Sequence, residues 1–291
     1  MKNPVFKGCA TALLTPFKDD LSVDYEAYAT LVSRQVEGGV DFLVPLGTSA
    51  ETPTLNREEK REILKITKKH APGIPLLVGC GSNSVDATLE NISTLEYADA
   101  LLIVVPFYNK PTQEGIYQYY KALAEKTELP IIMYNVPGRT GVNMSAETSL
   151  RISNEVKSVI GIKEASGNMS QVKEIIDNCP DDFIVLSGDD DMTFDLIKAG
   201  AQGVISVASN ILPAQVSQMV HLALKGHEAE AKLLNDKLYP LFKGCFIESN
   251  PIPAKEALHQ LGLCSAKMRL PLTEASEHTK GLIRNILKEW I

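Results

Sequence analysis

Eight short apolar runs, each followed by a stretch of helical character, make up the first 225 residues of the chain. The runs are nearly continuous in apolar residues, which is typical of parallel strands in a sheet covered by helices. Eight such units in series predict an α/β protein, a closed (β/α)8 TIM barrel. The runs begin at Phe6, Asp41, Pro75, Ala100, Pro130, Val159, Phe183 and Gly203.

A doubly wound open sheet is the alternative arrangement for alternating strands and helices. It would place a G-x-G-x-x-G turn after an early strand, but the first run continues into "LLTPF" instead. We therefore expect residues 1–225 to form a catalytic barrel. Residues 226–291 contain about three amphipathic segments, and we expect them to form a C-terminal helical extension used for packing or subunit contacts.

The composition excludes several classes of function. The formal net charge is −7 and no basic block is present, so the chain lacks the positive surface that nucleic-acid binding needs. No apolar run approaches the ~18 residues of a membrane span, and no secretory signal is expected. The five cysteines are scattered without C-x-x-C spacing, as in reduced cytosolic proteins. We expect a cytoplasmic protein.

One strand carries a lysine at its carboxyl end, where the functional groups of such barrels lie. Alternation puts Ile160 and Ile162 on the face toward the helices. It puts Lys163 on the inner face, between the small residues Gly161 and Ala165. Burial disfavours the charged form of lysine, and a neutral amine can attack a carbonyl to form a Schiff base. A lysine that pairs with a carboxylate or extends to solvent is the other interpretation.

Other strand ends carry groups that suit the same chemistry. The phenol of Tyr134 can both donate and accept protons, although a core tyrosine is an equal alternative. Arg139 can bind a carboxylate or be a solvated loop residue. The turn at 47–51 offers hydroxyl and N–H groups to a small carboxylate. No metal or other cofactor is predicted, and the acidic residues 189–191 would repel a phosphorylated substrate.

Four motifs in order carry a family resemblance: "GTSAE", "YNVPGRTG", "GIKEASGN" and "LSGDD". Together they resemble the dihydrodipicolinate synthase family of Schiff-base, pyruvate-dependent aldolases and lyases. The resemblance covers nearly the whole chain, including "NPIPAK" in the tail. It implies a homotetrameric (β/α)8 enzyme, a dimer of dimers, that condenses pyruvate with aspartate 4-semialdehyde in lysine and diaminopimelate biosynthesis.

The resemblance also implies catalytic roles for four residues. Lys163 matches the family's imine-forming lysine, and Tyr134 matches its proton-shuttling tyrosine. Thr48 and Tyr108 match the remaining members of the proton relay. In the family this second tyrosine reaches across from a neighbouring subunit.

Four further residues match substrate-binding positions of the family. Ser49 falls where a threonine usually contacts the pyruvate carboxylate, and Arg139 matches the arginine that holds the semialdehyde carboxylate. Gly188 and Ile205 match residues that line the pyruvate pocket. The loop also departs from the family's usual G-T-T-G-E, because Ala50 replaces glycine. Position 50 must therefore avoid backbone angles that only glycine tolerates.

A second departure concerns feedback inhibition by lysine. In inhibited members a second site at the dimer interface uses histidine, glutamate and tyrosine side chains. The corresponding positions here hold Arg57, Lys60, Ala87 and Phe107, and Asn83 alone is retained. Loss of an acid and gain of bases should repel a cationic effector, so we expect weak or absent inhibition by lysine.

The nearest alternatives share the imine step but use another aldehyde: N-acetylneuraminate lyase, or a keto-deoxy sugar-acid aldolase. Arg139 favours a short acidic aldehyde and so favours the synthase. A non-catalytic barrel with a binding or regulatory role is the alternative from a different class. Such a protein would be free to lose Lys163 or Tyr134, and both are present.

Overall fold

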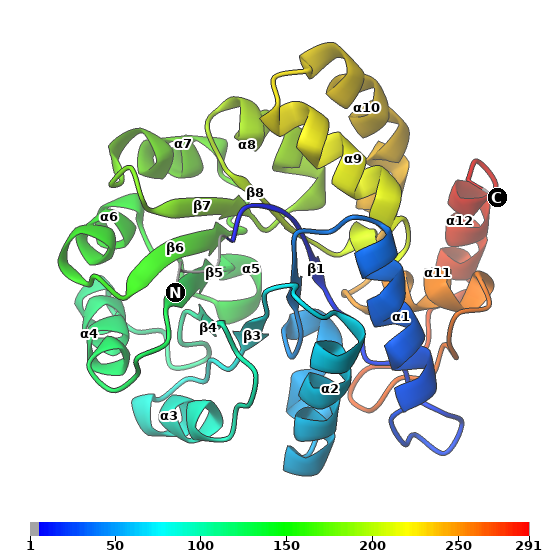
Figure 1. Ribbon diagram of the computed structural model, residues 1–291, viewed down its shortest axis with the longest axis horizontal. Helices are drawn as coiled ribbons and strands as arrows, with labels where there is room; N and C mark the ends of the chain where they lie inside the picture. The colour runs from blue at the N-terminus through cyan, green and yellow to red at the C-terminus, as the bar shows by residue number, and fades with distance from the viewer. Residues whose placement is uncertain (1–5, 291) are drawn as a thin grey trace.

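Eight parallel strands form the centre of the molecule (Figure 1). The structure, a computed structural model, describes residues 6–290. The strand order is β2-β1-β8-β7-β6-β5-β4-β3, and a bridge from Leu43 to Leu76 joins the two ends, which confirms the predicted (β/α)8 barrel. The strands are β1 (Gly8–Ala12), β2 (Phe42–Val44), β3 (Leu77–Gly79), β4 (Ala100–Val104), β5 (Ile131–Asn135), β6 (Val159–Glu164), β7 (Ile184–Ser187) and β8 (Gly203–Ser206).

Helices surround the strands on the outside of the barrel (Figure 1). Their starts follow local capping: Asn56 accepts a hydrogen bond from the Glu59 N–H at 2.8 Å, and the Glu59 carboxylate accepts one from the Asn56 N–H at 2.9 Å. The helices up to the last barrel unit are α1 (Tyr25–Glu37), α2 (Arg57–His70), α3 (Val85–Ser93), α4 (Gln113–Ala124), α5 (Pro137–Thr140), α6 (Ala146–Glu155), α7 (Met169–Asn178), α8 (Thr193–Lys198) and α9 (Pro213–Leu224).

The interior of the barrel is a packed core. Phe6 and Phe42 meet edge to face at its amino-terminal end, with ring centroids 5.4 Å apart. Branched side chains such as Leu77 and Ile132 fill the middle, and Tyr134 belongs to the same cluster toward the carboxyl end. The barrel is therefore closed below the region where the functional side chains lie.

The expected alternation of β6 is wrong at one position. Ile160 packs against the barrel-interior cluster, whereas Ile162 lies with the residues that face the helices, as expected. The cause is a register shift: Ile131 pairs with Val159, but Ile132 pairs with Gly161. The extra residue in β6 breaks the period-two pattern at its start, and the pattern holds again from Gly161 onward.

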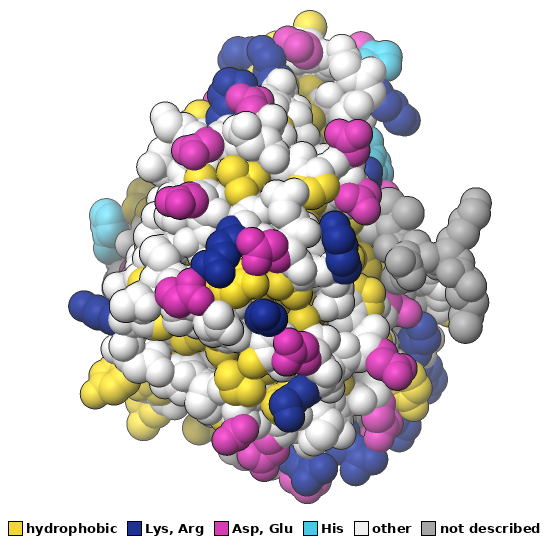
Figure 2. All heavy atoms as spheres, turned by 90° about the vertical axis from the view of Figure 1, so that its left-hand side faces the viewer, with side chains coloured by type: hydrophobic (Ala, Val, Ile, Leu, Met, Phe, Trp, Pro, Cys, Tyr) yellow, Lys and Arg dark blue, Asp and Glu magenta, His cyan; other side chains and the backbone are white. Residues whose placement is uncertain are grey.

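The surface of the outer helices carries charges of both signs. Figure 2 shows the face on the side of α4, α6 and α7, where Lys and Arg are interspersed with Asp and Glu around small apolar areas. None of the described helices has the length and apolar character needed to cross a membrane. All five cysteines are free, as predicted, and Cys9, Cys80 and Cys245 are buried.

Three further helices follow the barrel: α10 (Glu228–Gly244), α11 (Ile252–Gln260) and α12 (Glu277–Leu287). They lie along α9 and α1 at one side of the barrel (Figure 1). Leu241, Leu258 and Ile283 from these helices belong to the same apolar cluster as Leu31 of α1 and Val216 of α9. The extension therefore shares its hydrophobic core with the first and last helices of the barrel.

A buried ion pair ties this extension to the turn that follows β2. Lys255 of α11 is fully buried and Glu51 is 3% exposed, and the Lys255 ammonium donates to the Glu51 carboxylate. The other Glu51 oxygen accepts from the Arg269 N–H at 3.2 Å, and Lys255 also donates to the Lys267 carbonyl at 3.1 Å. Burial lowers the pKa of Lys255, so the ammonium depends on the Glu51 carboxylate to remain charged.

Removing one member of this pair should destabilise the protein strongly. Lys255→Met leaves the Glu51 carboxylate buried without its cation, which costs about 3–5 kcal/mol. The double variant Lys255→Met/Glu51→Gln removes both charges and should recover most of that loss. The measurement is the free energy of unfolding in urea.

The matched control is Lys232→Met, which breaks the exposed pair of Lys232 with Asp236 on α10. It should change the free energy of unfolding by less than about 1 kcal/mol. Equal effects of Lys255→Met and Lys232→Met would show that burial of the Lys255–Glu51 pair has no consequence.

Candidate active site

Lys163 and Tyr134 face each other at the carboxyl ends of β6 and β5. The two residues are register partners, and they are 6% and 7% exposed. The Lys163 Nζ lies 4.3 Å from the centroid of the Tyr134 ring. An amine and an aromatic ring that carries a phenol are therefore in contact, which is the pairing that the sequence predicts for proton transfer during imine chemistry.

Gly188, just after β7, allows the backbone to approach the lysine. A Cβ atom at this position would lie 2.6 Å from the Ala165 Cβ and 3.1 Å from the Lys163 Cε. Ile205 of β8 is fully buried in the barrel-interior cluster that contains Tyr134. Gly188 thus lies against Lys163, and Ile205 shares an apolar cluster with Tyr134.

A hydrogen-bonded network lies behind Lys163 and Tyr134, and sequence reasoning missed it. Asn135 and Glu164 pair in register immediately after Tyr134 and Lys163. The Glu164 carboxylate is 1% exposed and accepts from Asn135 Nδ2 at 3.0 Å and from Gln171 Nε2 at 3.0 Å. Burial raises the pKa of Glu164. These contacts fix β5 against β6, and therefore fix Lys163 against Tyr134.

The turn after β2 and the C-terminal extension meet through one asparagine. Ser49 is 2% exposed, and its hydroxyl accepts from Asn250 Nδ2 at 2.9 Å. The Asn250 carbonyl accepts from Arg139 Nη2 at 3.0 Å. The two predicted carboxylate-binding residues are thereby linked through Asn250, the first residue of the "NPIPAK" segment, to which the sequence analysis gave no role.

Among residues 6–290, neither Thr48 nor Tyr108 forms a side-chain hydrogen bond with Tyr134. Thr48 is exposed, and Tyr108 is 87% exposed with a left-handed backbone (φ 74°). The Tyr108 N–H donates to the Thr140 carbonyl of α5 at 3.3 Å, so the backbone is held while the side chain projects outward. Such an arrangement suits a residue that acts on a neighbouring molecule.

The turn that carries Thr48 and Ser49 accommodates alanine at position 50. Residues Thr48–Ala50 form a short 3-10 helix, in which any residue is tolerated. The left-handed positions of the turn fall at Leu46 (φ 56°) and Glu51 (φ 53°) instead. Ala50 therefore avoids the angles that only glycine tolerates, as expected.

Comparison with known proteins identifies the family to which the chain belongs. A sequence profile of the Dihydrodipicolinate synthetase family matches residues 5–290. The chain belongs to this family. It is 50% identical over 286 residues to the 4-hydroxy-tetrahydrodipicolinate synthase of Parabacteroides distasonis, covering 97% of this chain and 96% of the relative. Membership of the dihydrodipicolinate synthetase family makes the chain an enzyme, an aldolase-type lyase.

Solved structures agree with the family assignment over the whole fold. The dihydrodipicolinate synthase of Thermotoga maritima is 45% identical with a TM-score of 0.95, and the match covers 98% of both chains. The chloride-inhibited enzyme of Acinetobacter baumannii, solved in complex with pyruvate, is 42% identical with a TM-score of 0.95. That match covers 98% of this chain and 99% of the other.

The three consecutive acids of this family member have three different environments. Asp190 is 2% exposed and accepts from the Val207 and Ala208 N–H groups at 2.9 and 3.0 Å, which caps the turn after β8. Asp191 pairs with Lys243 of α10 at 3.0 Å. Among residues 6–290 no group of three or more His, Cys, Asp or Glu side chains is placed to hold a metal ion.

Asp189, the third of these acids, lies half-buried near Lys163. Burial raises the pKa of Asp189 to about 6, although the charge of Lys163 opposes that rise. The folded state therefore binds a proton at Asp189 more tightly than the unfolded chain does. Asp189 stabilises the fold when protonated, and this contribution is lost as the pH rises from about 4 to about 6.

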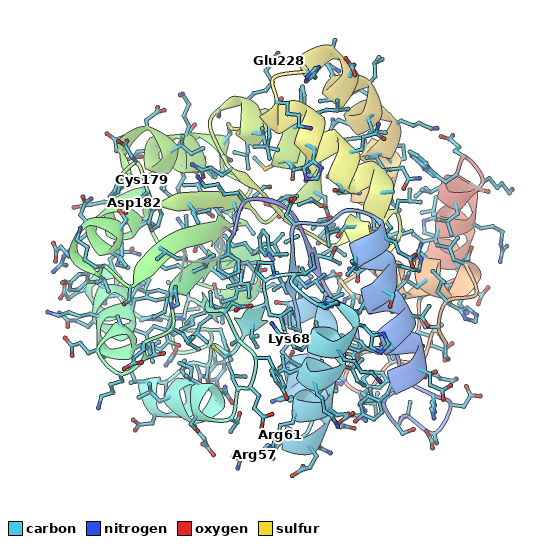
Figure 3. The ribbon with its side chains drawn as sticks, in the orientation of Figure 1. Arg57, Arg61, Lys68, Cys179, Asp182 and Glu228 are labelled. Atoms are coloured by element: carbon cyan, nitrogen blue, oxygen red, sulfur yellow. The ribbon has the colours of Figure 1, made fainter. Side chains whose placement is uncertain are left out.

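Asp189→Asn should remove this dependence on pH. Relative to the variant, the free energy of unfolding of the wild type should fall by up to about 3 kcal/mol between pH 4 and pH 7. Urea unfolding at several pH values measures it. Asp182→Asn, an exposed carboxylate at the other end of β7 (Figure 3), is the control. A constant difference between wild type and Asp189→Asn across this range would contradict the raised pKa.

Proposed function

We propose that the protein catalyses the 4-hydroxy-tetrahydrodipicolinate synthase reaction, the condensation of pyruvate with L-aspartate 4-semialdehyde in lysine and diaminopimelate biosynthesis. The observation that carries the proposal is the buried amine of Lys163 against the Tyr134 ring, 4.3 Å from its centroid. The names of the relatives support the same reaction. We propose that the protein acts in the cytoplasm.

The reaction begins at Lys163. Its neutral amine attacks the ketone carbon of pyruvate, and loss of water gives an iminium ion. The iminium withdraws electrons from the neighbouring methyl group, which loses a proton to give an enamine. The enamine carbon then bonds to the aldehyde carbon of the semialdehyde. Finally the substrate's own amino group displaces Lys163 by transimination, closing the ring and freeing the enzyme.

Protons move through hydroxyl groups in this scheme. Tyr134 donates a proton to the ketone oxygen, which leaves as water, and then accepts a proton in turn, since a phenol both donates and accepts. Thr48 and Tyr108 complete the relay, with Tyr108 supplied by a neighbouring subunit of a homotetramer, a dimer of dimers. The 87% exposure of Tyr108 on an anchored backbone supports that arrangement.

Two groups hold the substrate carboxylates. Ser49, buried at the carboxyl end of the barrel, donates to the carboxylate of pyruvate, and Gly188 and Ile205 form the wall around its methyl group. Arg139 binds the carboxylate of the semialdehyde with its planar guanidinium. The complex of the Acinetobacter baumannii relative with pyruvate supports a pyruvate site in this fold.

The sugar-acid lyases share the imine step and differ in the aldehyde. A long polyhydroxylated aldehyde needs many neutral hydrogen-bonding groups, whereas Arg139 suits a short acidic one. Turnover of pyruvate with aspartate 4-semialdehyde, compared with pyruvate plus N-acetylmannosamine, distinguishes the two.

The same proposal includes weak or absent inhibition by lysine. Arg57 lies beside Arg61 at the N-terminal end of α2 (Figure 3), and Lys60 is on the same turn of the helix. Asn109 Nδ2 donates to the Asn83 carbonyl at 2.9 Å, which ties the loop of Phe107 to Asn83. The basic side chains of Arg57 and Lys60 disfavour binding of a cationic amino acid.

Lys163→Ala and Arg139→Ala should separate the two substrate roles. With pyruvate and borohydride, the wild type and Arg139→Ala should gain a stable mass on the peptide that carries Lys163, and Lys163→Ala should gain none. Arg139→Ala should raise the KM for semialdehyde by roughly tenfold or more, because a charged hydrogen bond to its carboxylate is lost. Absence of any adduct on the wild type would refute the Schiff-base mechanism, and unchanged semialdehyde kinetics in Arg139→Ala would refute the substrate assignment.

Lysine should have little effect on the rate. At millimolar lysine we expect inhibition of less than about twofold, because Arg57 and Lys60 should repel a cationic effector. Steady-state assays with both substrates at their KM values measure this effect. The single variants Arg57→Glu and Lys60→Glu should increase sensitivity to lysine. Strong inhibition of the wild type at submillimolar lysine would contradict the expectation.

A further inference from the structure

We propose that Asn250 is a positioning residue for the condensation: its side chain orients the Ser49 hydroxyl toward the pyruvate carboxylate, while its backbone carbonyl holds Arg139. The proposal rests on the roles proposed above for Ser49 and Arg139. It assigns to the C-terminal extension a part in the active site, beyond packing or subunit contacts.

The first step of the argument is the contact itself. Asn250 Nδ2 donates to the Ser49 Oγ at 2.9 Å, and the two residues are 5% and 2% exposed. A serine hydroxyl has one proton to donate and two lone pairs that accept. Because Ser49 accepts from Asn250, its proton is left to donate elsewhere, and a carboxylate is an acceptor. The contact therefore fixes the direction in which the Ser49 hydroxyl can donate a hydrogen bond.

The second step concerns the freedom of Ser49. Serine lacks the γ-methyl group that restricts the χ1 angle of threonine, so its own stereochemistry does not fix the hydroxyl direction. Only contacts from outside the residue can do so. The hydrogen bond from Asn250 is such a contact, and it comes from a residue 201 positions away in the sequence.

The third step is an atom of Asn250 without a partner. Its Oδ1 is buried and has no hydrogen-bond partner among residues 6–290. An unpaired buried acceptor costs free energy, and this one belongs to the amide that contacts the Ser49 hydroxyl. A half-turn of the amide would let Ser49 donate to Oδ1 and would free Nδ2 to donate to a carboxylate. In both orientations one donor at this contact is left for substrate.

The fourth step is the rigidity of both partners. Glu51 follows Ser49 by two residues, Lys255 follows Asn250 by five, and the two form the buried ion pair. The Lys255 N–H also donates to the Pro251 carbonyl at 2.9 Å, at the start of α11. The Lys255–Glu51 ion pair therefore fixes the backbone segments that hold Asn250 and Ser49 in contact.

Asn250 makes two hydrogen bonds in the site, and a side-chain substitution removes only one of them. The bond to Ser49 comes from the side chain, whereas Arg139 Nη2 donates to the backbone carbonyl at 3.0 Å. The pyruvate end and the semialdehyde end of the site should therefore respond differently to the same variant. A residue with a merely structural role would not separate them.

Asn250→Ala should raise the KM for pyruvate by roughly tenfold, the effect of one hydrogen bond. It should also slow borohydride trapping of pyruvate on Lys163 at low pyruvate concentration. The KM for semialdehyde should change by less than about twofold, because the backbone contact to Arg139 remains. Ser49→Thr should reduce the effect of Asn250→Ala, because the γ-methyl group then fixes the hydroxyl.

The matched control is Asn235→Ala, which changes another buried asparagine with an unpartnered Oδ1, on α10 of the same extension. Neither KM should change in it. If Asn250→Ala does not fold, Asn250→Ser carries the same measurement, because its shorter side chain cannot span the distance to Ser49 and serine is favourable in turns.

Two results would overturn the proposal while leaving the proposed function intact. One is a wild type that traps pyruvate together with an Asn250→Ala variant of unchanged pyruvate KM. The other is an equal rise of both KM values in Asn250→Ala. A wild type that traps no pyruvate would refute the proposed function itself, and the role of Asn250 with it.

Discussion

The buried Lys255–Glu51 pair is the contact on which the arrangement of the site depends. It joins residues 204 positions apart, one in the turn after β2 and one in the extension. Compared with apolar residues of the same size, a buried ion pair adds little stability. Separating its two charges would leave each of them buried without a partner, which is strongly unfavourable. The pair therefore defines where the turn lies relative to α11. Arg269, which contacts Glu51 through its N–H, binds Glu59 of α2 through its guanidinium.

The site is supported in two different ways. The proposed catalytic residues Lys163 and Tyr134 are on neighbouring strands, and the buried Glu164–Asn135 network fixes the register of those strands. The proposed carboxylate-binding residues are on a turn and a short helix, where the backbone alone gives less rigidity. Long-range contacts supply the rigidity there. Pairing of neighbouring strands thus positions the proposed catalytic residues, and contacts with the extension position the proposed substrate-binding residues.

The sequence predicted most of what is local. Apolar runs gave the eight strands, and alternation correctly put Lys163 on the inner face, because side-chain direction follows from the period of a strand. The same rule failed at Ile160, where an extra residue shifts the register and nothing in the residue types marks it. Asn250 could not be found from the pattern, since its partner is 201 positions away and only the folded chain brings them together.

Tyr108 is a second residue whose surroundings could not be predicted from the sequence pattern. Its left-handed backbone is held by the Thr140 carbonyl, and its side chain is 87% exposed. In our proposal this exposed side chain serves a second subunit, which one chain cannot display. The proposed site therefore combines three parts: strands that position Lys163 and Tyr134, the extension that contacts the proposed carboxylate-binding residues, and a second subunit that completes the proton relay.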